Sequence, residues 1–202
     1  MQNQTTTTTE KRILEAAEEE FLESGYDGAR TVSIAEKAGV THAMLHYYFR
    51  SKEQLFQRIL DDKVDILINS VMTAFFHSGK PLIERIEDGI SAHLDFLAAN
   101  EKLPLFVVRE VGMRDIPLID RLMDYAGSKL REMQQEMDAL AEQGIIRTTD
   151  ALMLLFDIIS QNVFPFLILP AALKLVPERD KADLLEQLKR ENIQLIQSRL
   201  KV

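Results

Sequence analysis

The sequence predicts an all-α fold, and three observations support this prediction. Apolar residues recur at spacings of three and four along most of the 202 residues, which is the period of an amphipathic helix. The alternation of β-branched and polar residues that is typical of strands is scarce. No proline precedes Pro81, so no proline interrupts helix formation in the early part of the chain.

Four helices are expected in the amino-terminal part, at about residues 9–24, 33–38, 42–49 and 51–76. The first should end at Gly25, a residue that readily takes the left-handed conformation of a helix terminus. The two short helices are separated by a three-residue turn and therefore cannot lie flat against each other. Ser51 and Gln54 form a capping-box pattern at the start of the fourth helix.

Five more helices are expected beyond that point, at about residues 82–99, 103–114, 118–143, 150–175 and 181–201. Pro165 and Pro170 should kink or end the fourth of these. The stretch 151–176 is apolar enough to suggest a membrane span, but it is interrupted by Asp157, Ser160, Gln161, Asn162, Pro165, Pro170 and Lys174. We therefore favour a buried or interface helix there.

Composition indicates a folded protein without thiol chemistry. Hydrophobic residues make up 46% of the chain and charged residues 28%, which supports a packed core and excludes collagen-like and disordered classes. The absence of cysteine excludes disulfides, thiolate metal sites and cysteine nucleophiles. The polar amino terminus lacks the apolar core of a signal peptide, so we expect a mobile tail and a cytoplasmic protein.

Residues 31–52 satisfy the requirements of a helix-turn-helix. Ala35 is small where the two helices would cross, and Gly39 can take the left-handed turn conformation. A small core would be supplied by Ile34, Val40 and Leu45. Such a motif places its second helix in the major groove of DNA.

The expected DNA contacts follow from this geometry. Thr31 and Thr41 would cap the two helices, so their hydroxyls and the exposed amides meet phosphate. Base edges would be read by the residues that begin the second helix, His42, Ala43 and Met44. Bases or backbone would be reached by His46, Tyr47 and Tyr48.

Positive charge is concentrated on the same segment, although the whole chain carries a net charge of -8. Positions 30–58 hold five basic residues, Arg30, Lys37, Arg50, Lys52 and Arg58, against the acidic Glu36 and Glu53. Electrostatic attraction would therefore turn this segment, and not the acidic remainder, toward DNA.

A set of residues at fixed spacing carries a family resemblance: Gly25-Tyr26, Thr31-Val32, Ile34-Ala35, Ala38-Gly39-Val40, Leu45, Tyr48-Phe49, Ser51-Lys52 and Leu55. With this set, positions 10–60 resemble the TetR family of one-component transcriptional regulators. The resemblance implies a nine-helix dimer whose paired amino-terminal modules bind a palindromic operator and whose larger part binds an effector. By position, the resemblance implies base contacts at the three residues that begin the second helix, and phosphate contacts, or neighbours of them, at Thr31, Thr41, His46, Tyr47, Tyr48 and Lys52. Ser33 is also expected among the DNA contacts. His46 and Ala43 depart from the residues common at their positions.

We therefore expect a tail and helix-turn-helix DNA-binding domain at residues 1–50 and a helical effector-binding and dimerisation domain at residues 51–202. The expected function is that of a ligand-responsive repressor that binds its operator as a homodimer and is released by a small, mainly apolar effector. The expected partners are double-stranded operator DNA, the effector and a second copy of the chain, with no membrane. No cofactor and no metal are expected.

An apolar effector pocket is expected in the second domain. Its candidate lining residues are Phe96, Met113, Met123 and Phe156, with Gln161 or Asn162 orienting the ligand. Methionine and phenylalanine at these positions equally suit a packed core. The two amides would also suit the dimer interface or a neighbouring carbonyl. The dimer itself is expected to form through residues 152–159 and the apolar residues of the last helix, Ile193, Leu195 and Ile196.

Other classes of function fit the sequence less well. An enzyme using His93, Asp95 and Glu110 would need a nucleophile, a base and an orienting group, and the spacing assembles none. His42 and His46 have the i, i+4 spacing of a zinc pair, but a third ligand is missing nearby. A helical interaction module without DNA binding remains a further alternative.

Overall fold

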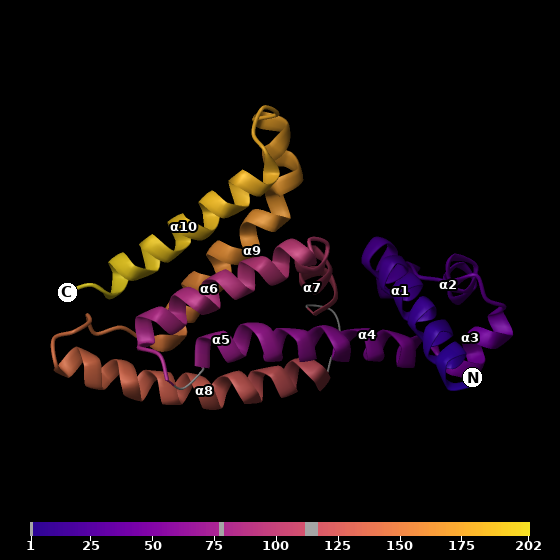
Figure 1. The fold of residues 1–202 in the computed structure, drawn as a ribbon, viewed down its shortest axis with the longest axis horizontal. Coiled ribbons are helices and arrows are strands. Elements are labelled where there is room, and N and C mark those ends of the chain that lie inside the picture. Colours follow the sequence, from indigo (N-terminus) through magenta and orange to yellow (C-terminus); the bar gives the residue numbers. More distant parts are fainter. Residues whose placement is uncertain (1, 77–78, 112–116) are drawn as a thin grey trace. The chain divides into compact units, whose positions relative to one another are not determined.

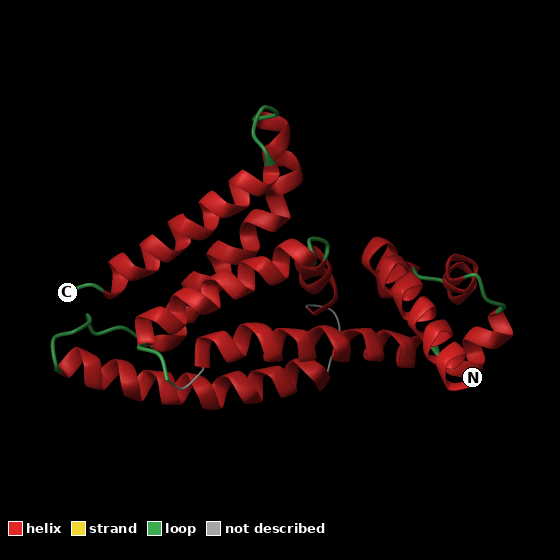
Figure 2. Ribbon diagram, viewed as in Figure 1, coloured by secondary structure: helices red, strands yellow, loops and turns green. Residues whose placement is uncertain are grey.

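The computed structural model describes residues 2–76, 79–111 and 117–202, and all regular secondary structure in these ranges is helical (Figure 2). The described residues form ten α-helices and one π-helix, and no strand occurs among them. The predicted all-α fold is therefore confirmed.

The chain divides into two compact units. The first comprises Met1–Asp65 and Phe106–Leu118, and the second comprises Ile66–Leu105 and Ile119–Val202. The first unit holds the helices α1 (Gln2–Gly28), α2 (Thr31–Ala38), α3 (His42–Tyr48) and most of α4 (Lys52–Leu67) (Figure 1). The helix α7 (Leu103–Val111) contributes residues to both units.

Aromatic packing forms the centre of the first unit. The rings of Phe21 and Phe56 are buried and meet edge to face, with centroids 5.1 Å apart. The ring of Tyr26 lies 4.9 Å from that of Phe56, again edge to face. Such aromatic pairs contribute about 0.5 to 1.5 kcal/mol each beyond the area that they bury. They join α1 to α4 and so fix the scaffold on which α2 and α3 are held.

The first helix is longer than the sequence predicts. It begins at Gln2 instead of Thr9, so the residues expected to form a mobile tail are helical. Nothing in the amino-terminal polar run, neither proline nor glycine, stops a helix from extending toward the terminus. At Gly25 the backbone takes φ 72° and ψ 174°, which kinks the helix at the predicted end before it continues to Gly28.

The predicted helix at residues 51–76 is interrupted. It consists of α4, the π-helix η1 (Ile68–Met72) and α5 (Thr73–Phe76). The carbonyl of Ile68 accepts from both the amide and the hydroxyl of Thr73, five residues later, which is the hydrogen-bond step of a π-helix. At the other end, the amide of Gln54 donates to Ser51 Oγ at 3.1 Å, as the capping pattern predicts.

The second unit is built around α6 (Leu82–Ala99), α8 (Pro117–Glu142), α9 (Ala151–Leu175) and α10 (Lys181–Leu200). The last two are joined by a short loop, and α10 turns back along α9 (Figure 1). The core contains apolar side chains from each of these four helices, for example Ile86, Ile90, Met137, Leu154 and Leu200. This unit therefore has a hydrophobic core of its own.

The helix α9 continues through Pro165 and Pro170, so these prolines do not end it; whether they kink it stays a prediction. By length and composition alone it could cross a membrane, and 28% of its most apolar stretch is buried in the structure. Large apolar side chains are exposed along it, at Leu152, Met153, Phe156, Ile159, Phe164, Ile168 and Leu175.

Candidate functional site

The segment between α2 and α3 has the geometry of a helix-turn-helix. Gly39 takes φ 63° and ψ 38°, the left-handed conformation that the sequence predicts for it. Its amide donates to Glu36 O, and the next amide, that of Val40, donates to Ala35 O at 2.9 Å. Of the predicted small core, Ile34 and Leu45 are fully buried and Val40 is half-buried.

The two threonines play different parts. Thr41 caps α3 as predicted, since its hydroxyl accepts the amide of Met44 at 3.2 Å. Thr31 does not cap α2: Arg30 occupies the cap position and makes no side-chain capping bond. The hydroxyl of Thr31 instead lies 3.0 Å from His42 Nε2, and this hydrogen bond links the start of α2 to the start of α3. The prediction of a Thr31 cap is therefore wrong, because the helix begins at Thr31 itself, two residues before the predicted start.

The predicted contact residues of α3 lie on one outer face. His42, Ala43, Met44, His46 and Tyr47 are exposed, and the side chain of Tyr47 is 81% exposed. The rings of His42 and His46 meet edge to face with centroids 4.4 Å apart. Tyr48 is half-buried, and its ring centroid is 5.5 Å from that of Tyr47. This face offers imidazole and phenol groups for hydrogen bonds together with apolar surface for a thymine methyl group.

A depression at the start of α2 gathers further predicted contacts. It is lined by Ala29, Arg30, Thr31, Val32, Ser33, Glu36 and Lys52. First-turn amides of a helix and a nearby ammonium group form a suitable environment for a phosphate. Ser33, however, donates to Glu20 at 2.9 Å and is therefore already engaged within the protein.

Most of the basic residues of this segment are bound within the first unit. Lys37 pairs with Glu20 at 3.1 Å and with Glu23 at 3.2 Å, and Arg58 pairs with Asp62. Burial raises the pKa of the Glu20 carboxyl, but hydrogen bonds from Ser33, Lys37 and the Arg30 amide outweigh it and leave that pKa below its ordinary value. Glu20 therefore stays ionised and holds Lys37.

Lys52 is also engaged. Its Nζ donates to the carbonyls of Tyr26 at 2.7 Å and Ala29 at 3.1 Å, and it lies 4.5 Å from the centre of the Tyr26 ring. An ammonium group at the end of a helix stabilises the exposed carbonyls there. Lys52 thus fixes the end of α1, and one of its three protons is left for an outside acceptor.

Two basic residues of this segment, Arg30 and Arg50, are not among the predicted DNA contacts. Arg30 and Arg50 are exposed, and within the described residues their guanidinium groups make no ion pair. The available signal was their position, because each lies just outside one end of the two motif helices. Both guanidinium groups are exposed beside the motif helices and could contact phosphate. The pairing of Lys37 with Glu20 could not be inferred from sequence spacing, because the two residues are far apart along the chain.

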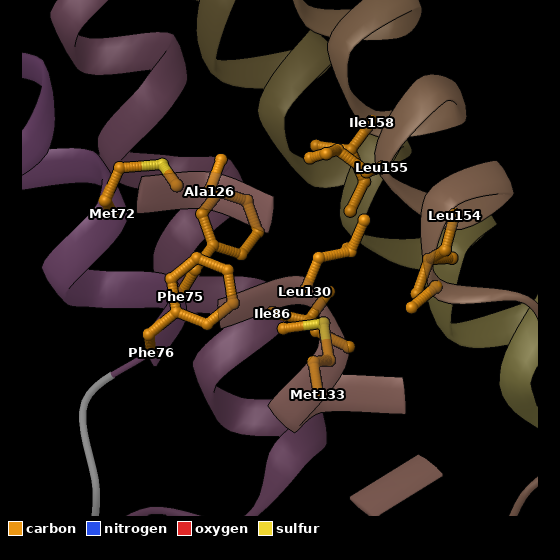
Figure 3. Close-up of a pocket in the computed structure, with 11 residues that line it drawn as sticks. Met72, Phe75, Phe76, Ile86, Ala126, Leu130, Met133, Leu154, Leu155 and Ile158 are labelled. Carbon is orange, nitrogen blue, oxygen red and sulfur yellow. The ribbon is translucent and has the colours of Figure 1, made fainter. Parts of the chain in front are cut away.

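The second unit contains a small apolar cavity of about 30 Å³. Side chains from η1, α5, α6, α8 and α9 surround it (Figure 3). The lining residues are Met72, Phe75, Phe76, Ile86, Ala126, Leu130, Met133, Ala151, Leu154, Leu155 and Ile158. This volume holds about one water molecule, well below the hundreds of Å³ that ligand pockets occupy, so a ligand must open it.

The residues predicted to line a pocket lie elsewhere wherever the structure describes their side chains. Phe96 is buried in the core, and Phe156 is 54% exposed on the outside of α9. Gln161 is half-buried. Met113 lies outside the described residues, and the side chain of Met123 is likewise not among those described. The sequence pattern identified the unit that holds the cavity but not its lining.

Asn162 is fully buried and joins three helices by hydrogen bonds. Its Nδ2 lies 3.3 Å from Nδ1 of His93 and 3.4 Å from the carbonyl of Ile90, both on α6. Its Oδ1 accepts from Nδ2 of Asn192 on α10 at 2.9 Å. Burial lowers the pKa of His93 from 6.5 to about 4, so this imidazole is neutral near pH 7. The amide thus serves the protein's own packing.

The alternative sites fail to assemble among the described residues. Asp95 pairs with Lys189 at 2.6 Å, His93 is held by Asn162, and the side chain of Glu110 is not described. No group of three or more histidine or carboxylate side chains in the described part of the chain could hold a metal ion.

Comparison with known proteins identifies the first unit. Residues 13–59 match the family model described as bacterial regulatory proteins, tetR family. The transcriptional regulator RutR of Escherichia coli K12 is 42% identical over 72 residues, which cover 36% of this chain and 34% of RutR. The transcriptional activator FasR of Mycolicibacterium smegmatis is 33% identical over 86 residues, covering 43% of this chain and 39% of FasR. The chain thus spans less than half the length of these relatives in the aligned regions.

The fold of the whole chain is similar to that of solved regulators. AibR, crystallised with isovaleryl coenzyme A and operator DNA, superposes with a TM-score of 0.69 at 19% identity, over 93% of this chain and 97% of AibR. The homologues are regulators and not enzymes, and the helix-turn-helix of this chain has the geometry that DNA binding requires. Residues 13–59 thus match the amino-terminal model of the TetR family, and the chain as a whole has the fold of solved transcriptional regulators.

Proposed function

We propose that the protein is a homodimeric repressor that binds a palindromic operator and is released by a small, mainly apolar effector. The observation that carries the proposal is the combination of a helix-turn-helix in the first unit with a small apolar cavity in the second. Residues 1–50 would form the DNA-binding domain and residues 51–202 the effector-binding and dimerisation domain. Such a protein would act in the cytoplasm.

DNA recognition is proposed to use two sets of residues. His42, Ala43 and Met44 would contact base edges, with His46, Tyr47 and Tyr48 next to them on α3. Phosphate would be bound by Thr31, Thr41 and Lys52, joined by Arg30 and Arg50. Ser33 would contribute its first-turn backbone amide, because its hydroxyl donates to Glu20. In a dimer, two recognition helices about 34 Å apart would read two half-sites one helical turn apart, which explains a palindromic operator.

Replacing Arg30 or Arg50 by alanine is expected to weaken binding to all DNA sequences alike. Each loss of a phosphate contact should lower the slope of log affinity against log salt by about one unit per protomer. Lys52→Ala should do the same and also lower stability, because its ammonium group binds two carbonyls. Fluorescence anisotropy with operator and unrelated duplexes over a series of KCl concentrations measures these effects.

Two variants serve as references for that experiment. Arg58→Ala should leave the salt slope unchanged, since Arg58 pairs with Asp62 at 3.1 Å. His42→Ala should instead relax base preference at particular operator positions. If all these variants gave the wild-type salt slope and one specificity profile, the division into phosphate and base contacts would be wrong.

Dimerisation is supported by the exposed apolar face of α9 and α10. Phe156 is 54% exposed, Leu152 41% and Ile159 40%, and these side chains recur at helical spacing. Leu195 of α10 is 55% exposed, whereas Ile196 is buried and belongs to the core of the subunit. Contiguous apolar surface of this kind is typical of an interface, and a two-fold axis would bury it against itself.

Replacing Phe156 by glutamate is expected to produce a monomer, because the dimer would bury an unpaired charge at that position. Sedimentation velocity at micromolar concentration measures the change. Ile145→Glu is a matched control, since Ile145 is also 54% exposed but lies in the loop after α8. A monomeric wild-type protein would contradict the dimer.

An apolar effector is supported by the lining of the cavity, in which all the residues are hydrophobic. AibR, a protein of similar fold, was crystallised with isovaleryl coenzyme A, which carries a short branched acyl group. Met72 and Met133 are unbranched side chains that can move aside to enlarge the cavity. An effector releases DNA only if it binds the DNA-incompetent state more tightly, so effector and operator must weaken each other's binding equally.

The proposal is tested by selecting the bound operator from genomic fragments and then titrating the complex with a library of lipophilic compounds. We expect one retarded species with two half-sites and release by a subset of compounds. Transcription from the selected operator should rise when the gene for the regulator is deleted, whereas a fall would indicate an activator. Absence of any specific fragment would overturn the proposal.

A further inference from the structure

Arg85 is a buried cation with an unused donor. It lies on α6, is 8% exposed, and its Nη2 donates to the carboxylate of Glu136 on α8. Its Nε is buried and has no hydrogen-bond partner. A buried donor that loses its water without gaining an acceptor costs free energy, and the cost is larger for a charged group.

The two nitrogens form one edge of the guanidinium group. Nε and Nη2 point in parallel and match the two oxygens of a carboxylate, which is the strong bidentate arrangement for arginine. Glu136 uses Nη2 and leaves Nε empty. The side chain of Glu136 is 41% exposed, so it can turn into water at small cost. The Glu136 carboxylate therefore uses one of the two donors on this edge of Arg85 and can be displaced from it.

This ion pair lies on the same helix interface as the apolar cavity. Ile86, which directly follows Arg85 on α6, lines the cavity, and so does Met133, one turn before Glu136 on α8. Leu82 and Ile86, on either side of Arg85, belong to the surrounding core. The lining itself carries no charged residue, so Arg85 is the buried cation next to an otherwise apolar site.

We propose that the effector is an amphipathic carboxylate whose apolar chain enters the cavity and whose charged end replaces Glu136 on Arg85. The incoming carboxylate accepts from both Nε and Nη2, and Glu136 turns into water. The buried charge balance is unchanged by this exchange, while the unused donor gains an acceptor. The inference rests on the proposed function, because it names the chemical class of the effector for the same cavity.

Octanoate and 1-octanol test this inference, because they share the alkyl chain and differ in the charged end. Binding to the full-length protein is measured by calorimetry and by the shift of the thermal unfolding midpoint. We expect octanoate to bind at least about tenfold more tightly than 1-octanol, as expected for charge-assisted hydrogen bonds. Arg85→Met should remove this preference and preserve binding of the alcohol. Arg131→Met, which removes an exposed arginine of α8, is the control and should preserve the preference.

Glu136→Gln distinguishes the exchange from a purely structural role of the pair. Removing the competing carboxylate should tighten octanoate severalfold and leave 1-octanol unchanged, and this variant keeps Arg85 and the packing. If Glu136→Gln weakens both compounds or changes neither, the exchange is wrong. Equal binding of the two compounds to the wild-type protein would overturn the inference of a carboxylate effector and leave the apolar cavity as the effector site. If neither compound binds, both the carboxylate inference and the apolar effector site are overturned.

Discussion

Replacing Gly89 by alanine is expected to lower the free energy of unfolding by about 2 kcal/mol. A Cβ atom at this position would lie 2.3 Å from Cδ1 and 2.4 Å from Cγ of Phe75. The ring of Phe75 is 6% exposed and belongs to the core, so it cannot turn aside without displacing its neighbours. Overpacking of this kind costs about 1 to 3 kcal/mol or more, and the better helix propensity of alanine offsets only part of it.

Gly127→Ala is the matched control, because Gly127 also lies inside a helix, α8. Its nearest side-chain neighbour would be Nη1 of Arg131 at 3.8 Å, an ordinary contact. Only the higher helix propensity of alanine then acts, so the free energy of unfolding of this variant should rise by up to about 1 kcal/mol. Urea unfolding followed by circular dichroism measures both changes. Combining Gly89→Ala with Phe75→Leu should restore part of the loss, and equal shifts of the two glycine variants would contradict the close approach.

Stability is expected to fall by about 2 to 3 kcal/mol as the pH is lowered from about 7 to about 4, through the contribution of His93 alone. Its pKa is about 4 in the folded protein and 6.5 at its ordinary value, because burial disfavours the imidazolium ion. Between these values the unfolded chain binds more protons than the folded one, so stability rises with pH. The contribution of His93 to stability is fully present above pH 6.5 and is lost progressively as the pH falls from 6.5 to about 4.

The measurement is the urea midpoint at about pH 5 and about pH 7.5, in the wild-type protein and in His93→Gln. The variant should show a smaller difference between the two conditions, since glutamine does not titrate and its carbonyl can still accept from Asn162. His46→Gln removes an exposed histidine and should leave the difference as it is in the wild type. A pH response of His93→Gln equal to that of the wild type would contradict the role of burial.

Much of the helical framework follows from local sequence signals. The boundaries of α6 agree with the predicted residues 82–99, because Pro81 precedes its first turn and apolar spacing runs without a break to Ala99. Gly39 and Thr41 fix the turn and the cap of the helix-turn-helix by their own backbone and side-chain chemistry. Signals of this kind act over a few residues and are therefore readable in the chain.

Other features depend on how distant segments pack. The π-helix has no recognisable signal in residues 68–72, and the close contact that admits only a glycine at position 89 comes from a ring on another helix. The apolar pattern marks residues as buried without saying which of them border a void, so the predicted pocket residues are not those that line the cavity. Lys37 looks free in the sequence because Glu20 is distant along the chain.

The apolar character of α9 also bears on how a newly made chain is sorted. As it leaves the ribosome, this helix has the length and composition of a membrane segment, before any partner covers it. Asp157 lies within the helix, about two turns from its start, and an ionised carboxylate inside the hydrocarbon region of a membrane costs free energy on insertion. In the folded subunit the same carboxylate pairs with Arg199 of α10. One acidic residue thus both discourages insertion of the nascent helix and docks the last helix once folding brings Arg199 to it.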